Sequence, residues 1–360
     1  MNLFGQELTR EEILARVGDI SQVGGPVPAV LSEGMANGVR TIDVRSPGGI
    51  SFAVIADRGL DIGRADYCGV PLVWRSPVGD VNPVFADQHP YGWLDVFGGG
   101  LLTTCGLGAV GQPGYDAGES LGLHGKVSRL PAQGVRYAGD WVQDEYVVTI
   151  EAEVREASAL GPVLQMRRRI TTTLGRPQLR VEDVVTNLGA APTPHMFRYH
   201  CNFGFPLLSE DARLQLGSRA VEPRDEASAE AADKLEQIWP PSSRSKEHVY
   251  TVEPADTAGG ASAALSNPTL AGGITLSLHW SRDTLPWLVV WKQLSRGNYV
   301  LALEPSNCHD DGRAAERRRG TLVELEPGQH RRYWLDVTVV PGQPGQGPQP
   351  LLTEGTTNVD

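Results

Sequence analysis

The chain has 360 residues, a net charge of −11, and a composition of 40% hydrophobic and 21% charged residues, which is typical of a soluble globular protein with a sizeable core. The acidic balance disfavours a nucleic-acid partner, because phosphate binding needs clustered Lys and Arg. No basic segment followed by a long apolar run opens the chain, and no apolar stretch approaches the roughly 18 residues of a membrane helix, so we expect a cytoplasmic protein without a membrane partner.

Two stretches of the sequence predict helices. Thr9–Glu12 has the spacing of a capping box and leads into an apolar run, so residues 1–24 are expected to form an N-terminal helical segment. Glu226–Ile238 is rich in Ala, Glu, Lys and Leu and is stopped by two prolines. Elsewhere, 42 glycines and 26 prolines disfavour long helices.

Between these breaks, several runs alternate apolar and polar residues with β-branched side chains, which predicts half-buried antiparallel strands. The runs are Tyr146–Val154, Leu179–Thr186, Ile274–Trp280, Tyr299–Leu303, Gly320–Leu325 and Tyr333–Val340. The segment Glu326–Gln329 has the composition of a hairpin turn between the last two.

The sequence shows no internal repeat and no linker before residue 340. We therefore predict a mostly β protein in which residues 25–340 form one large antiparallel β-sandwich with few short helices. The Pro- and Gly-rich residues 341–360 are expected to be a disordered or loosely docked tail. The arginine triplets at 167–169 and 317–319 are expected on solvated strand or loop faces.

The cysteines do not indicate a metal or redox site. Cys68, Cys105, Cys201 and Cys308 are widely separated without CxxC spacing. We expect neither a zinc ribbon nor a disulfide framework.

Two glycine-containing runs could carry a ligand. In Asp57–Gly63, a tight turn that uses the glycines is one interpretation; the other is that Arg58, or Arg75 further on, points a guanidinium into a cleft. The three glycines Gly98–Gly100 lack the motif of a phosphate loop. They favour a strand that another backbone or a ligand approaches closely.

Three further residues are candidates for chemistry. His124 precedes a glycine in a polar loop, His200 lies in a strand-like run, and Glu304 ends another such run before a proline. A histidine and a carboxylate can exchange protons with a substrate as acid and base. Each residue taken singly has a structural alternative, namely a histidine satisfied by a neighbour or a glutamate facing solvent.

The same side chains could instead bind a metal. His124, His200, Glu304 and His309 offer a mixed nitrogen and oxygen donor set. No HxH or HExxH pair fixes two ligands at once, so no metal is assigned. A hydrolase triad is not assigned either.

The chain resembles the aldose 1-epimerase (galactose mutarotase-like) superfamily, and within it an uncharacterised DUF4432-like branch. The resemblance lies in Asp57–Gly63, Phe97–Leu107, His124-Gly125 and Glu304-Pro305, and covers roughly residues 25–340. It implies a supersandwich fold and a small-molecule sugar or sugar derivative as partner.

The resemblance also implies roles for residues. His200 matches the general acid that protonates the ring oxygen, and Glu304 matches the base that deprotonates the anomeric hydroxyl. His124 matches a sugar-contacting histidine, and Arg58 or Arg75 a binding arginine. Asp283 stands for an aspartate that holds sugar hydroxyls, and Trp291 could stack on the sugar.

A sugar mutarotase without a cofactor is the function that this resemblance implies. Two alternatives use the same residues. One is a metal-dependent keto-sugar isomerase or epimerase, and the other is a non-catalytic carbohydrate-binding protein.

Overall fold

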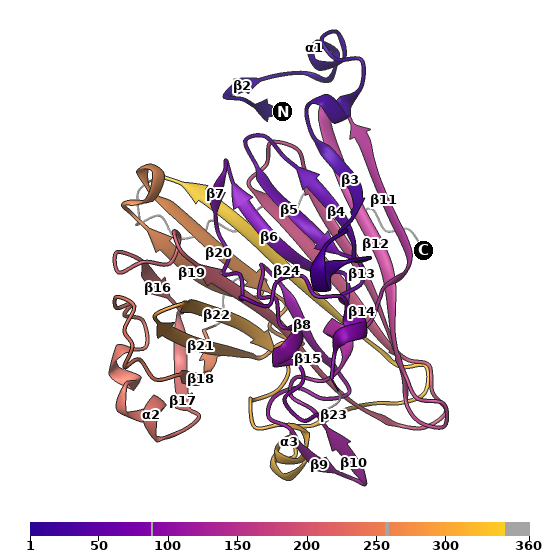
Figure 1. Ribbon diagram of the computed structural model, residues 1–360, viewed down its shortest axis with the longest axis vertical. Coiled ribbons are helices and arrows are strands. Elements are labelled where there is room, and N and C mark those ends of the chain that lie inside the picture. The colour runs from indigo at the N-terminus through magenta and orange to yellow at the C-terminus, as the bar shows by residue number, and fades with distance from the viewer. Residues whose placement is uncertain (88, 256–258, 343–360) are drawn as a thin grey trace.

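The computed structural model describes residues 1–87, 89–255 and 259–342. Within these ranges the chain consists mainly of antiparallel strands in three large sheets (Figure 1). No helix in this part of the chain is long and apolar enough to cross a membrane.

One layer is an eight-stranded antiparallel sheet. Its strands, in spatial order, are β11 (Gln133–Val142), β12 (Glu145–Ala157), β13 (Val163–Thr173), β14 (Gln178–Asn187), β24 (His330–Pro341), β20 (Ile274–Trp280), β19 (Ala261–Asn267) and β16 (Arg213–Gln215). Burial alternates strictly along β12 from Glu145 to Val154, because successive side chains of a strand point to opposite faces.

Two further sheets complete the architecture. The seven-stranded sheet contains β17 (Ser218–Pro223), β18 (His248–Pro254), β21 (Trp287–Ser295), β22 (Asn298–Ser306), β15 (Thr193–Gly204), β23 (Val323–Leu325) and β8 (Thr103–Leu107), the last paired with β15. The five-stranded sheet contains β3 (Gly25–Val30), β4 (Arg40–Arg45), β5 (Ile50–Ile55), β6 (Asp61–Tyr67) and β7 (Val70–Pro71). Small ribbons pair β1 (Asn2–Leu3) with β2 (Gln6–Glu7) and β9 (Gly114–Asp116) with β10 (Glu119–Leu121).

The main hydrophobic core draws side chains from all three large sheets. Phe52 of β5, Ile150 of β12 and Leu303 of β22 belong to one buried cluster. Isolated bridges between Ile62 and Leu102 and between Val73 and Phe203 connect the five-stranded sheet to the seven-stranded one. The predicted mostly β sandwich is thereby confirmed.

The helices differ in part from the prediction. The described residues contain three short α-helices, α1 (Arg10–Leu14), α2 (Glu226–Glu230) and α3 (Arg313–Arg319). The capping box at Thr9 and Glu12 is present. The second predicted helix stops at Glu230 and continues only as a 3-10 turn at Ala232–Lys234, so it is shorter than the sequence indicated.

Helix α3 was not expected, although its sequence carries helix signals. Ala, Glu and Arg are good helix formers, and Gly320 ends the helix in a left-handed conformation with φ of 74°. The expectation that the arginine triplet at 317–319 lies on a strand or loop was therefore wrong, because these residues form the last turn of α3.

The other arginine triplet also differs from expectation at its centre. Arg168 is completely buried, and its guanidinium forms ion pairs with Asp61 and Asp183, both at 2.9 Å. Its neighbours Arg167 and Arg169 keep exposed side chains. Because the strand alternates, only the outer two arginines lie on the solvated face.

The turn at Glu326–Gln329 forms, with the Gln329 N–H donating to the Glu326 carbonyl at 2.9 Å. It does not make a hairpin, because β23 before it lies in the seven-stranded sheet and β24 after it lies in the eight-stranded sheet. Of the predicted tail, Pro341 closes β24, and residues 343–360 lie outside the described residues.

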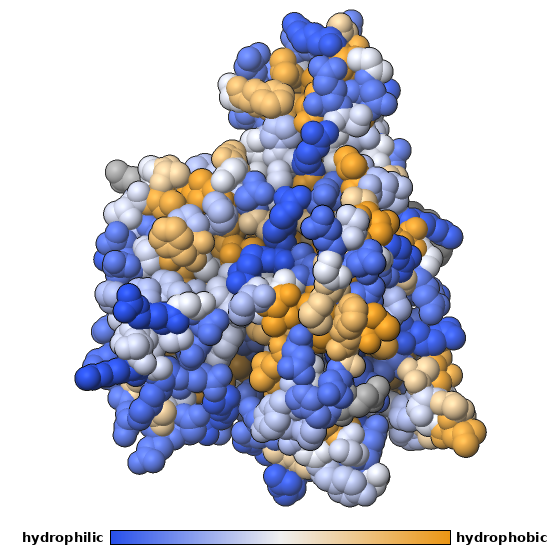
Figure 2. All heavy atoms as spheres, viewed as in Figure 1, coloured by the Kyte–Doolittle hydropathy of each residue, from blue (hydrophilic) through white to orange (hydrophobic). Residues whose placement is uncertain are grey.

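Apolar side chains are interspersed with polar ones over the face drawn in Figure 2, and one apolar group lies near the lower centre of that view. The four cysteines are all free thiols.

Candidate functional site

Strand β15 has two different faces. Phe197, Tyr199 and Cys201 belong to the main core, so the alternate residues Arg198 and His200 point to the other side of the seven-stranded sheet. Every residue of β15 from His195 onwards is buried. The face that carries His200 is therefore also covered by protein, in this case by loops.

His200 and Glu304 lie in contact on this face. Strand β22 pairs with β15 so that Cys201 lies opposite Leu303, and Nε2 of His200 lies 3.2 Å from Oε1 of Glu304. The two residues are only 4% and 2% exposed. The two side chains face each other, but this separation leaves no room for a six-membered sugar ring between them.

Arg198 fixes the position of Glu304. Its fully buried guanidinium donates to Oε2 of Glu304 at 3.1 Å and to Oδ1 of Asp310 at 2.7 Å. It also donates to the Ser306 hydroxyl and to the His309 carbonyl. One arginine thus holds the carboxyl groups of Glu304 and Asp310 side by side.

A chain of ion pairs extends from this buried cluster to the surface. Asp310 Oδ2 lies 3.3 Å from Arg224 Nη1, and Arg224 Nη2 lies 2.7 Å from Glu247 Oε2. The other oxygen of Glu247 accepts a hydrogen bond from the indole N–H of Trp291 at 2.9 Å. The side chain of Glu247 is 48% exposed, so the network ends at the rim of the site.

Aromatic rings surround His200. The ring centroids of Trp93, Phe97 and Trp291 lie 5.9, 5.2 and 5.7 Å from that of His200. Trp93 and Phe97 stack on each other at 4.1 Å. The predicted Trp291 is therefore part of the cluster, and Trp93 and Phe97 join it from the segment that precedes β8.

His124 belongs to the same cluster, with its ring centroid 5.9 Å from that of His200. Its backbone is left-handed, with φ of 53°, and its Nδ1 accepts a hydrogen bond from the Gly111 N–H at 3.3 Å. A Cβ on the next residue, Gly125, would lie 2.4 Å from the carbonyl oxygens of Gly106 and Ala109. The His-Gly pair in the sequence thus reflects a turn that packs tightly against β8.

Burial sets the ionisation of the central groups. It raises the pKa of Glu304 to about 8, against the opposing charge of Arg198. Burial, with the nearby His124 and Arg198, holds the pKa of His200 well below its usual 6.5, and burial lowers the pKa of His124 to about 4. Without a ligand, the carboxyl of Glu304 and both imidazoles are therefore mainly uncharged at neutral pH.

Other predicted residues lie elsewhere. Arg58 is buried and donates to the backbone carbonyls of Ser128 and Val81, and Arg75 pairs with Asp80 at 2.7 Å. Asp283 is exposed on the turn that follows β20. No hydrogen bond or ion pair among the described residues joins these three residues to the His200–Glu304 pair, and the arginine that contacts the pair is Arg198.

The sequence contained a signal for Arg198, because it stands two residues before His200 and a strand places such residues on one face. Asp310, Arg224 and Glu247 had no comparable signal, since they reach the site from separate loops.

The residues considered for a metal do not form a metal site in the described part of the chain. Within residues 1–87, 89–255 and 259–342, no group of three or more His, Cys, Asp and Glu residues is placed to hold a metal ion. His309 instead bonds through Nδ1 to Glu316 at 2.9 Å.

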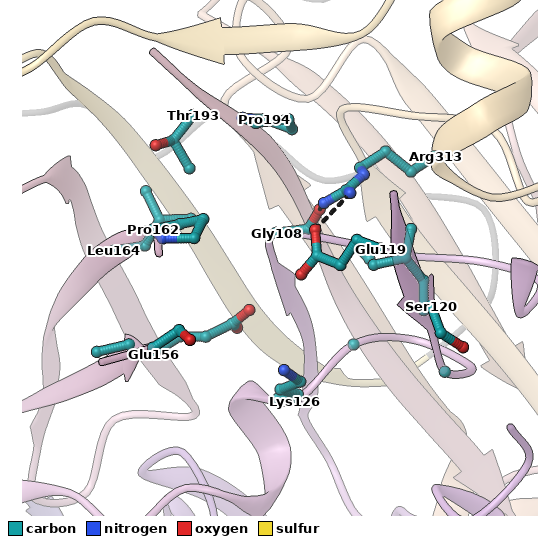
Figure 3. A pocket seen from close by; sticks show the side chains of 16 residues that line it. Gly108, Glu119, Ser120, Lys126, Glu156, Pro162, Leu164, Thr193, Pro194 and Arg313 are labelled. Atoms are coloured by element: carbon teal, nitrogen blue, oxygen red, sulfur yellow. Dashed lines mark hydrogen bonds and ion pairs between the residues drawn. The ribbon is translucent and has the colours of Figure 1, made fainter. Parts of the chain in front are cut away.

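A small cavity lies beside the His124 turn rather than at the pair. Its volume is about 60 Å³, and its lining includes Gly125, Lys126, Glu156 and Arg313. Figure 3 shows the side chains of Lys126 and Glu156 pointing into it, with Arg313 held by Glu119. Ligand pockets for drug-sized molecules usually measure about 300–1,000 Å³, so this cavity is too small for a sugar.

Comparisons with known proteins agree with the fold. A family model described as a domain of unknown function (DUF4432) matches residues 36–339. A structure from Klebsiella pneumoniae subsp. pneumoniae MGH 78578, provisionally described as an aldose 1-epimerase, is 26% identical with a TM-score of 0.83 and covers 88% of this chain and 83% of its own. A search of curated proteins finds no match.

Two more distant structures show the fold alone. Galactose 1-epimerase from Lactobacillus acidophilus NCFM is 14% identical, with a TM-score of 0.58, over 89% of this chain and 100% of its own. A galactose mutarotase-like protein from Clostridium acetobutylicum is 13% identical, with a TM-score of 0.58, over 88% and 98%. This chain therefore belongs to the DUF4432 family and has the fold of the aldose 1-epimerase and galactose mutarotase-like proteins.

Proposed function

We propose that this protein is a sugar mutarotase of the aldose 1-epimerase type, in which His200 and Glu304 carry the proton transfers. The observation that supports this most directly is the 3.2 Å contact between a buried imidazole and a buried carboxyl group. The fold supports such chemistry only by analogy, so the proposal rests on this pair and its surroundings.

The side-by-side arrangement suits the reaction. The anomeric hydroxyl and the ring oxygen of a cyclic sugar are bonded to the same carbon, so an acid and a base that touch both oxygens can be neighbours. They need not stand on opposite sides of the ring. A sugar resting on the pair would replace the direct contact of His200 with Glu304 by contacts with its two oxygens.

The reaction needs one proton donor and one acceptor. The Glu304 carboxylate takes the proton of the anomeric hydroxyl, the bond from the anomeric carbon to the ring oxygen breaks, and protonated His200 delivers a proton to that oxygen. The aldehyde group then rotates about its bond to the neighbouring carbon. The reverse proton transfers close the ring by attack on the other face of the aldehyde, which gives the other anomer. Arg198, 3.1 Å from Glu304, stabilises the carboxylate form that this direction requires.

The surrounding groups are suited to hold a sugar. Since His124 Nδ1 accepts from a backbone N–H, the neutral imidazole carries its proton on Nε2 and can donate it to a hydroxyl. Trp291, which is only partly buried, offers an aromatic face for the apolar side of a ring.

The test is NMR measurement of anomer exchange for a panel of monosaccharides, with spontaneous exchange subtracted. We expect Glu304→Gln to lower the catalysed rate at least 100-fold (general acid–base steps contribute about 10²–10⁴) while sugar binding persists. Glu326→Gln is the control, because Glu326 is exposed and also precedes a proline. An active Glu304→Gln variant, or a wild type that accelerates no anomer exchange, would refute the proposal.

A further inference from the structure

We infer that Glu247 determines the specificity of the proposed sugar site. By pairing with Arg224 at the rim of the site, it prevents this arginine from binding the acidic group of a sugar. The inference rests on the proposed function for the location of the site. It depends on the charges and contacts of Arg224, which lies between the buried cluster and the surface.

Arg224 is the kind of residue that binds anions. A guanidinium offers a planar set of donors that matches carboxylate and phosphate groups, and this side chain is 20% exposed. Its neighbour Asp310 contacts Arg198, which in turn contacts Glu304. An acidic substituent of a sugar bound over the pair would therefore come close to Arg224.

The donors of Arg224 are already occupied by carboxylates. Nη1 faces Asp310 at 3.3 Å, and Nη2 faces both Asp225 at 3.1 Å and Glu247 at 2.7 Å. One positive charge thus meets three carboxyl groups. An incoming anion would have to displace a carboxylate and approach the others, which like-charge repulsion opposes.

Glu247 is the member of this set that can be changed without removing its other contact. Its Oε1 accepts the indole N–H of Trp291 at 2.9 Å, and the amide oxygen of a glutamine can accept the same bond. Glu247→Gln therefore removes one negative charge from Arg224 while Trp291 keeps its partner beside His200. Of the three carboxyl side chains, that of Glu247 is also the most exposed, at 48% against 40% for Asp225 and 8% for Asp310.

The experiment compares matched neutral and acidic sugars, glucose with glucuronate and galactose with galacturonate. Binding is measured by ligand-observed NMR and anomer exchange by magnetisation transfer, with wild type, Glu247→Gln, Arg224→Gln and the double variant. The control is Glu151→Gln, which removes the same charge from an exposed ion pair with Arg169 on the eight-stranded sheet.

We expect wild type to favour the neutral member of each pair and Glu247→Gln to shift the ratio about tenfold toward the acid. The shift should vanish in the double variant, because Arg224 provides the attraction, and should be absent in Glu151→Gln. A ratio that Glu247→Gln leaves within twofold of wild type, or a wild type that prefers the acids, would overturn the inference.

The binding ratio separates this inference from the proposed function. If neutral sugars bind in the expected ratio but no protein accelerates anomer exchange, the mutarotase proposal fails and the role of Glu247 stands. If anomer exchange is catalysed but the binding ratio is not the expected one, the mutarotase proposal stands and the role of Glu247 fails.

Discussion

His200 and Glu304 lie in direct contact at 3.2 Å, so one proton can move from the carboxyl to the imidazole without a change in the number of protons on the pair. The neutral form and the charged form of the pair are therefore in a ratio that does not depend on pH. The fraction of protein that holds the reactive, singly protonated pair changes only when the pair as a whole gains or loses a proton.

This relationship predicts the pH profile of catalysis. The rate should be flat near neutrality and fall above about pH 8, where the pair loses the proton that burial keeps on Glu304. The acidic fall should come well below pH 6.5, since the pKa of His200 is depressed. The measurement is the catalysed anomer-exchange rate from pH 4 to 10 after subtraction of the buffer rate, and a catalysed rate that keeps rising beyond pH 9 would contradict this prediction.

The stability of the fold should also depend on pH through the ionisation of Glu304. Its pKa in the folded protein is raised from 4.5 to about 8, so its contribution is fully present below about pH 4.5 and is lost as pH rises through 8. The melting temperature of wild type should therefore fall relative to that of Glu304→Gln between pH 5 and pH 9.

Calorimetry of wild type and Glu304→Gln at pH 5 and pH 9 measures these melting temperatures. Any effect of the substitution that does not depend on pH cancels when the gap at one pH is subtracted from the gap at the other. Glu326→Gln, at an exposed position, should follow wild type. A constant gap between Glu304→Gln and wild type would show that the carboxyl is already ionised at pH 5.

Substitution of Arg168 should lower the unfolding free energy more than most other single substitutions. Arg168→Met leaves the buried Asp61 and Asp183 without the guanidinium that contacts each at 2.9 Å. Removing one partner of a buried ion pair typically costs about 3–5 kcal/mol.

The neighbouring Arg169 provides the control. It pairs with Glu151 at 2.7 Å but its side chain is 56% exposed, so Arg169→Met should change the unfolding free energy by less than about 1 kcal/mol. Urea denaturation compares the two variants, and equal losses would argue against a buried charge network at Arg168.

Gly125→Ala tests whether the turn positions His124. The new Cβ would lie 2.4 Å from two backbone carbonyl oxygens, and the residue has φ of 76°. Gly134→Ala is the matched control, because Gly134 also has a positive φ, of 61°, but nothing within 4 Å of the new atom.

Gly134→Ala should lower the unfolding free energy by about 1–2 kcal/mol, because alanine disfavours the left-handed conformation. Gly125→Ala should lower the unfolding free energy clearly more, as measured by urea denaturation, and should also weaken sugar binding. Equal losses for the two variants would mean that the backbone near β8 yields readily and that the turn does not fix His124.

The strands, and the choice of His200 and Glu304 as candidates that lie together, could be predicted because their signals are local or familiar. The alternation in Tyr146–Val154 reports burial directly, and β12 contains that run. The turn at Glu326–Gln329 was equally clear, yet local sequence does not say which sheet the next strand joins, and it joins the other one.

The identity of the site arginine depended on tertiary pairing. Arg58 stands in a glycine-containing run that looks suited to a ligand, and Arg75 follows it. The Arg58 guanidinium, however, donates to the Ser128 carbonyl, and that of Arg75 pairs with Asp80. Arg198 became the arginine of the cluster because β15 and β22 lie side by side in a particular register. That register joins residues more than a hundred positions apart and cannot be deduced from either strand alone.

The aromatic rings around His200 also make the protein its own optical probe. Trp93 and Trp291 lie within 5.9 Å of His200, ring centroid to ring centroid, and the indole of Trp291 is bonded to Glu247 at the rim. We expect a molecule that settles on the pair to change the surroundings of these indoles. Their emission can therefore follow the arrival of any sugar in real time, without a label or a coupled enzyme, whatever the identity of that sugar.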